Sequence, residues 1–175
     1  MAISRNVIET RDIYIGSANA PITITGYIDY ESLACAKLND VLHQLMETYE
    51  GKIRLNFRHF PMSNKHQKAM KAAEAAVAAA QENLFWQMHN KLLENQKQLG
   101  TISLKQYGKQ IGVKNKRFLD DLVNGIYAWQ VREDLLEAVD NGVTSAGVVF
   151  INGKKIEGDI SYEALSEIIN DILNA

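Results

Sequence analysis

Residues 30–37 read Tyr-Glu-Ser-Leu-Ala-Cys-Ala-Lys, and this stretch joins two different sequence patterns. Before it, the run Ile22–Ile28 is apolar and rich in β-branched residues, which is typical of a strand. After it, apolar residues follow at helical spacing as far as about Tyr49. Ser32 stands where a helix N-cap belongs, and Cys35 falls in the first helical turn. Because first-turn N–H groups and the helix dipole favour negative charge, the pattern predicts a thiol with a lowered pKa.

The segment around this junction resembles a known family signature. Residues 29–36, Asp-Tyr-Glu-Ser-Leu-Ala-Cys-Ala, are similar to the DYECPFCA motif of the DsbA-like thiol:disulfide oxidoreductases. Other phrases resemble family patterns: Gly16–Pro21 (GxxxAP), Arg58–Pro61 (RHFP), FWQMHNKLLENQ at 85–96, and Gly142–Gly153. The resemblance implies an α/β fold class, namely a thioredoxin fold with an inserted all-helical domain. It also implies thiol–disulfide chemistry on a protein or peptide partner, without a bound cofactor.

Three positions depart from the family pattern, each in a different part of the redox site. Ser32 stands at the attacking cysteine and cannot form a disulfide, which leaves Cys35 alone at the resolving position. Gly26 stands where many members carry a proton-handling Glu or Asp. Gly147 stands at the cis-proline, and because a non-proline cis bond costs about 3–4 kcal/mol, we expect the Ala146–Gly147 bond to be trans. The departures predict impaired dithiol–disulfide exchange.

The resemblance also implies where a substrate groove would lie. Leu33 and Ala34, next to the start of the motif helix, would form one side of it. Ala146 and Gly147, on the opposing loop, would form the other side. The motif positions Ser32 and Cys35 would then stand at the groove as the candidate catalytic residues.

Two further functions remain open for these residues. Kappa-class glutathione transferases resemble DsbA-like proteins in fold and use a serine near this position, so Ser32 could stabilise a glutathione thiolate. Cys35 could instead act as a single-cysteine redox sensor, which predicts an exposed sulfur. The simplest interpretation is structural: Ser32 caps the helix, and Cys35 is a small buried apolar residue.

The patterns along the chain predict a β–α–β unit, a long helical block and a β–β–α unit. Outside the motif, strands are expected at 12–16, 53–60, 148–152 and 154–157, and helices at 69–80, 103–111, 116–124, 126–139 and 161–173, with a helical face around 85–92. Asn152-Gly153 is a strong hairpin signal. We therefore assign residues 1–62 and 140–175 to the thioredoxin-fold domain and 63–139 to the inserted helical domain, with residues 1–11 as a loose arm.

Composition excludes several other classes of protein. The chain has 175 residues, is 46% hydrophobic and carries a net charge of −2, which argues against a nucleic-acid partner. No apolar run approaches the ~18–20 residues of a membrane span. The four histidines lack metal-ligand spacing with one another or with Cys35.

The compartment and wider context are predicted from the same features. The first residues do not form a signal peptide and one cysteine excludes an internal disulfide, so a reducing, cytoplasmic location is expected. DsbA-like domains also occur fused to membrane transporters, and the segment from Arg11-Asp12 onward resembles the start of such a domain.

Overall fold

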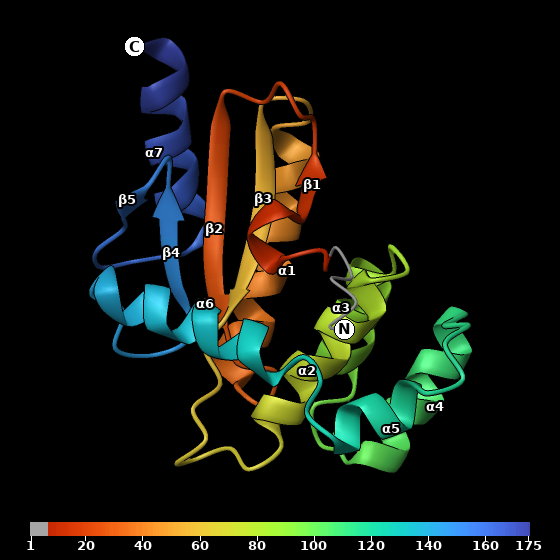
Figure 1. Cartoon of the computed structure of the whole chain (residues 1–175). Helices are drawn as coiled ribbons and strands as arrows, with labels where there is room; N and C mark the ends of the chain where they lie inside the picture. Colours follow the sequence, from red (N-terminus) through yellow and green to blue (C-terminus); the bar gives the residue numbers. More distant parts are fainter. Residues whose placement is uncertain (1–6) are drawn as a thin grey trace.

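The computed structural model describes residues 7–175, and a five-stranded sheet is the centre of this part of the chain (Figure 1). The spatial order of the strands is β1-β3-β2-β4-β5. They comprise β1 (Tyr14–Gly16), β2 (Ile22–Ile28), β3 (Ile53–His59), β4 (Val148–Ile151) and β5 (Lys154–Lys155). β2 and β3 are parallel, and the other neighbouring pairs are antiparallel. This order places β2, which leads into the motif, in the middle of the sheet.

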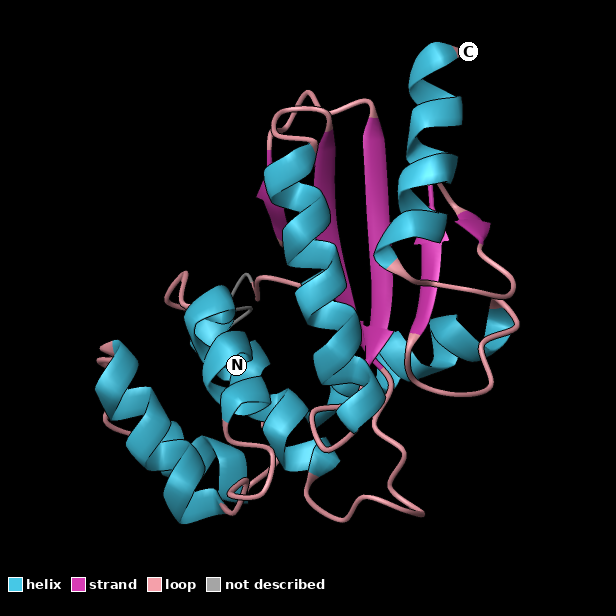
Figure 2. Ribbon diagram, turned by 180° about the vertical axis from the view of Figure 1, so that it is seen from behind, coloured by secondary structure: helices cyan, strands magenta, loops and turns pink. Residues whose placement is uncertain are grey.

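Helices cover the two faces of the sheet unequally. Figure 2 shows α1 (Leu33–Thr48) and α7 (Tyr162–Asn174) together on one face, whereas Figure 1 shows α6 (Ala128–Asp140) crossing only the lower end of the other. The remaining helices gather beside the sheet: α2 (Ala69–Ala80), α3 (Phe85–Glu94), α4 (Thr101–Ile111) and α5 (Phe118–Val123). Within residues 7–175, no helix is both long and apolar enough to cross a membrane.

Local sequence signals account for the element boundaries. The Ser161 hydroxyl accepts a hydrogen bond from the Ala164 N–H at 3.3 Å and so caps α7. Asn152 and Gly153 have φ angles of 48° and 78°, the left-handed backbone that a two-residue hairpin turn requires. The expected order of strands and helices is confirmed, although β1 and β5 are shorter than the predicted strands.

The prediction of a loose arm over residues 1–11 is wrong for the part that the structure describes. Residues Thr10–Asp12 form a short 3-10 helix, η1, and the buried Thr10 hydroxyl donates to Asp134 at 2.7 Å. Ile8 forms two backbone hydrogen bonds with the Gln81 side chain, at 2.9 and 3.1 Å. These long-range bonds fix the segment against the helices. The prediction for residues 1–6 lies outside the described residues.

Helix α2 joins the helical part of the chain to the rest. Its alanines allow neighbouring helices to approach closely, and α2 contacts α3, α4, α5 and α6. One cluster of buried apolar residues runs from the sheet through α2 into α4 and α5. The division into residues 1–62 with 140–175 and residues 63–139 therefore stays a prediction, because the core is continuous across it.

Candidate functional site

The motif turn connects the end of β2 to the start of α1, as expected. Ser32 is the N-cap, and its hydroxyl accepts a hydrogen bond from the Cys35 N–H at 3.3 Å. The Cys35 sulfur lies against the end of β2, where it accepts a hydrogen bond from the Asp29 N–H at 3.4 Å. Cys35 is fully buried, with 0% of its surface exposed. The structure thus brings Ser32 and Cys35 together at the motif, and only Ser32 reaches the surface in part.

The predicted lowering of the thiol pKa is wrong. Burial raises the pKa of Cys35 because it penalises the thiolate, and the charge of Asp29 adds to this effect. Hydrogen bonds from the Asp29 backbone and from Ser32 act in the opposite direction and do not compensate. The buried sulfur also lacks the exposure that the single-cysteine sensor hypothesis requires.

Asp29 holds a second segment of the chain against the motif turn. Its buried carboxylate accepts hydrogen bonds from the Glu31 N–H at 2.8 Å, from the Met62 N–H at 2.8 Å and from His66 Nδ1 at 2.9 Å. The Glu31 carboxylate in turn accepts from the Lys68 N–H at 2.8 Å. We call residues 61–68 the clamp loop. The spacing of His66 in the sequence gives no sign of a functional role, and the structure places it beside the motif.

Helix α3 and the residues after it anchor the motif from the other side. The Tyr30 hydroxyl is 3.0 Å from His89 Nδ1, and His89 Nε2 is 2.9 Å from Asn39 Oδ1. Burial lowers the pKa of His89 to about 3, so its ring is neutral. Because Asn39 Oδ1 can only accept, Nε2 carries the ring proton and Tyr30 donates to Nδ1. The Gln96 amide donates to the carbonyl oxygens of Tyr30 and Ser32 at 2.9 and 2.8 Å.

The opposing loop lies at the same end of the sheet as the motif. The Gly147 N–H donates to the Tyr27 carbonyl at the end of β2, at 2.7 Å. All peptide bonds within residues 7–175 are trans, which confirms the prediction for Ala146–Gly147. Gly147 has a φ of +89°, so proline, whose φ is fixed near −65°, cannot occupy this backbone.

The predicted groove residues differ in their surroundings. Leu33 is 71% exposed and Ala34 is also exposed, so both present apolar surface next to the motif. Ala146 is half-buried and packs against the core, and Gly147 is half-exposed. Their role as a substrate groove stays a prediction.

Gly26 has a packing explanation. It pairs with Phe57 across β2 and β3, and a Cβ at Gly26 would lie 2.9 Å from a ring carbon of Phe57. This distance is too short for an unstrained contact. The Phe57 ring therefore fills the space that a side chain at position 26 would need.

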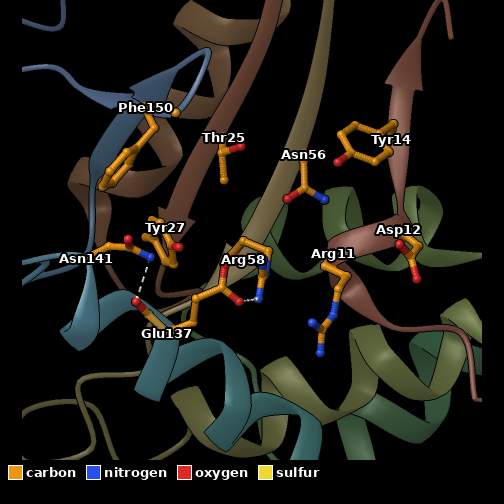
Figure 3. Close-up of a pocket in the computed structure, with 11 residues that line it drawn as sticks. Arg11, Asp12, Tyr14, Thr25, Tyr27, Asn56, Arg58, Glu137, Asn141 and Phe150 are labelled. Carbon is orange, nitrogen blue, oxygen red and sulfur yellow. Dashed lines mark hydrogen bonds and ion pairs between the residues drawn. The ribbon is translucent and has the colours of Figure 1, made fainter.

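A second candidate site lies on the sheet face opposite α1 and α7, and Figure 3 shows its side chains around an open hollow. We call it the sheet-face pocket, and its volume is about 370 Å³. Its lining residues are Arg11, Asp12, Tyr14, Thr25, Tyr27, Asn56, Arg58, Glu137, Asn141, Phe150 and Gly153. None of the site residues predicted from the sequence is among them. The sequence signal that could point to it is the alternation of apolar and polar residues over 53–58, which by itself predicts only a strand.

Arg58 and Glu137 form one wall of this pocket, and the buried Asp134 lies behind Arg58. Arg58 Nε donates to Asp134 at 2.6 Å, and its two terminal nitrogens donate to Glu137 at 3.1 and 2.5 Å. Asp134 also accepts from the Thr10 hydroxyl and from the backbone and ring nitrogens of His59. Burial acts to raise the pKa of Asp134, but the His59 hydrogen bond and the charges of His59 and Arg58 lower it overall.

Comparison with solved structures supports a DsbA-like fold. BdbD from Bacillus subtilis superposes with a TM-score of 0.84 at 22% identity, covering 93% of this chain and 92% of that protein. The thiol-disulfide exchange protein alpha-DsbA2 from Wolbachia pipientis gives 0.76 at 22% identity, covering 91% and 86%. MdbA, a thiol-disulfide oxidoreductase from Corynebacterium diphtheriae, gives 0.72 at 22% identity, covering 90% and 88%.

Curated relatives are longer than this chain. A Na(+)/H(+) antiporter NhaA 3 of Salinispora tropica is 32% identical over 159 residues, which are 91% of this chain and 24% of the antiporter. A Na(+)/H(+) antiporter NhaA of Herminiimonas arsenicoxydans is 29% identical over 85% of this chain and 23% of its own length. The chain thus spans about a quarter of the curated relatives that it matches. The family model described as Thioredoxin matches residues 9–171, and the chain therefore belongs to this thioredoxin family, with the fold of its DsbA-like members.

Proposed function

We propose that this protein is a DsbA-like thioredoxin-fold module without dithiol–disulfide turnover. It binds a protein or peptide partner at the surface around the motif turn. The observation that carries the proposal is the state of the motif. The attacking position holds the Ser32 hydroxyl, and the one thiol, Cys35, is fully buried with a raised pKa. The exposed apolar Leu33 and Ala34 provide contact surface beside it.

The chemistry of exchange explains why this motif favours binding over turnover. Exchange requires a thiolate that attacks the partner disulfide and a second thiol that resolves the mixed disulfide. A serine hydroxyl stays protonated near neutral pH unless a base activates it. The Ser32 oxygen already accepts the Cys35 N–H as the helix cap. Neither half of the two-step reaction is therefore supported by the residues of the motif.

The surrounding architecture supports the binding half of the proposal. The clamp loop and Gln96 hold the motif turn through hydrogen bonds, and the opposing loop is bonded to the end of β2 just before it. A surface that is already ordered loses less conformational entropy when a partner binds to it. In the relatives named as antiporters, the segment that matches this chain is about a quarter of a longer polypeptide. By analogy, the partner of this chain would be part of the same polypeptide or of the same membrane assembly. The cytoplasmic location expected from the sequence is likewise a proposal.

An insulin-reduction assay with dithiothreitol tests the absence of turnover. We expect the wild-type protein to match the Cys35→Ala variant and the uncatalysed background, because the buried thiol contributes nothing. Calorimetry with millimolar glutathione serves as the companion measurement, with no heat of binding expected. Reduction that is clearly faster than background, and that is lost in Cys35→Ala, would contradict the proposal.

A further inference from the structure

The sheet-face pocket is separate from the motif and is large enough for a small molecule. Its volume of about 370 Å³ falls in the range of roughly 300–1,000 Å³ that is usual for small-molecule sites. Figure 3 shows its floor formed by side chains of β2, β3 and β4, with α6 on one side and the segment around η1 on the other. These elements hold the pocket without any contribution from Ser32 or Cys35.

The lining residues of the pocket carry equal numbers of positive and negative charges. Arg11 and Arg58 bring two positive charges to its lining, and Asp12 and Glu137 bring two negative charges. Arg58 is further neutralised by the buried Asp134 at 2.6 Å. A phosphate or carboxylate would have to compete with these carboxylates for Arg58, and for Arg11 with the two glutamates that already pair with it. An ammonium ion would have to compete with Arg58 for Glu137. The pocket therefore favours a neutral ligand.

Its free hydrogen-bonding groups are both donors and acceptors. Asn56 commits both amide hydrogens to the carbonyls of Thr10 and Ile13, at 2.7 and 2.8 Å, so its own carbonyl oxygen is the group left for a ligand. Arg58 uses three of its five N–H groups on Asp134 and Glu137. The Thr25 hydroxyl can donate or accept. A matching ligand must itself carry several groups that donate and accept.

Aromatic rings stand on both sides of these polar groups. Tyr27 and Phe150 meet edge to face on one side, with ring centroids 5.7 Å apart. On the other side is Tyr14, which is 40% exposed and is held by the Arg54 guanidinium at 4.3 Å from its centroid. Aromatic side chains supply large apolar contact faces. A sugar ring combines apolar C–H faces with a rim of hydroxyl groups. The C–H faces match the aromatic walls of the pocket, and the hydroxyl groups match the polar groups between them.

We infer that the sheet-face pocket binds a neutral saccharide through the juxtaposition of Thr25, Asn56 and Arg58 with the rings of Tyr14 and Phe150, the latter supported from behind by the buried ring of Tyr27. This ligand site is independent of the thiol motif, and it goes beyond the proposed partner-binding function. The Arg58–Glu137 pair stays intact on binding and offers its remaining N–H groups and lone pairs to hydroxyls.

Two-dimensional ¹H–¹⁵N NMR tests the inference, with N-acetylglucosamine and cellobiose as probes and with sodium phosphate and free lysine as charged comparators. We expect saturable shifts at millimolar sugar, confined to amides of the pocket strands. Thr25→Val and Tyr14→Ala should each weaken the binding by about tenfold, since each removes one group that contacts the ligand. Thr48→Val, the same change at the far end of α1, should bind as the wild type does. The spectra themselves report whether each variant is folded.

Several results would overturn the inference. They are the absence of shifts with both sugars, saturation by phosphate or lysine at lower concentration than by sugar, and unchanged sugar binding in Thr25→Val. A shift that maps to the motif turn instead of the pocket would also overturn it. Because insulin reduction reports on the motif alone, a failure here is distinguishable from a failure of the proposed function.

Discussion

The sulfur of Cys35 lies in the first turn of α1, where the helix terminus favours a thiolate, yet its pKa is raised. Desolvation is the largest cause, and the buried Asp29 carboxylate adds repulsion at short range. Of the two motif positions, only position 32 reaches the surface in part. With serine at that position, the remaining thiol keeps the interior environment and behaves as a small apolar residue.

Cys35 should react slowly with a maleimide in the native protein at pH 7 and rapidly once the protein is unfolded in urea. Its native pKa lies above the ordinary value of 9.0, so the labelling rate should still increase with pH beyond 9. The same sign predicts that stability falls as pH rises past the unfolded pKa, because the folded state resists ionisation. Fast native labelling at pH 7 would mean that the thiol is exposed and acidic.

Position 147 requires glycine because of its backbone conformation and not because space is lacking. Its φ is +89°, and nothing lies within 4 Å of the position that a Cβ would take. We expect Gly147→Pro to lower the free energy of unfolding by about 3 kcal/mol, because proline cannot adopt this φ and removes the N–H donated to Tyr27. Gly147→Ala, which keeps the N–H, should cost less. Urea unfolding measures both, and a Gly147→Pro variant as stable as wild type would contradict this account.

At the scale of elements, the motif turn is held by segments far away in the sequence. The clamp loop is fixed by Asp29 through Met62 and His66. Gln96, beyond α3, holds the carbonyls of Tyr30 and Ser32. The helical block thus positions the turn in addition to packing beside it.

His66→Ala should loosen the clamp loop while leaving the fold intact. The variant loses one hydrogen bond to a buried carboxylate, for which we expect about 1–2 kcal/mol of lost stability. Amide exchange of Met62 should accelerate, whereas the amides of β2 should keep their protection. His43→Ala, a histidine on α1 without contact to Asp29, is the matched control. Equal Met62 exchange in the two variants would show that His66 does not hold the loop.

Asp134 joins α6 to β3 and η1 through bonds to Arg58, His59 and Thr10. Asp134→Asn should cost about 3–5 kcal/mol, since it leaves the buried Arg58 charge underpaired. The pKa of Asp134 is lowered in the fold, so its contribution is present above the ordinary carboxyl value of 3.8 and is lost as pH falls through the native value. Acid unfolding curves should therefore be flatter for Asp134→Asn than for the exposed control Asp140→Asn. Parallel curves would show that Asp134 does not provide this pH-dependent stability.

For the whole molecule, the fold followed from the sequence because its signals are local. The β-branched run before the motif, the Ser32 cap and the Asn152-Gly153 turn each fix one boundary, and the structure has them where expected. The family pattern then supplied the topology, which residue periodicity alone does not determine. The trans bond before Gly147 was predictable because it depends on one residue type.

The remaining features depend on contacts that no local pattern contains. Asp29 and His66 are 37 residues apart, and the loop that joins them has no regular spacing. The direction of the Cys35 pKa shift was missed because burial, a property of the packed core, outweighs the helix terminus. The sheet-face pocket draws its lining from β1, β2, β3, β4, α6 and the segment around η1, so it exists only in the assembled sheet.

We propose that this domain keeps the architecture of an exchange site and that the serine at the attacking position prevents exchange. The most direct measurement restores that sulfur: Ser32→Cys is compared with wild type and with Ser32→Cys/Cys35→Ala for disulfide formation by intact mass and for insulin reduction. We expect Ser32→Cys to form an internal disulfide with Cys35, since the two positions lie one helical turn apart with the Cys35 N–H bonded to the residue 32 side chain, and to gain activity that the other two proteins lack. A Ser32→Cys protein that folds but forms no disulfide, or a wild-type protein that is equally active, would contradict the claim.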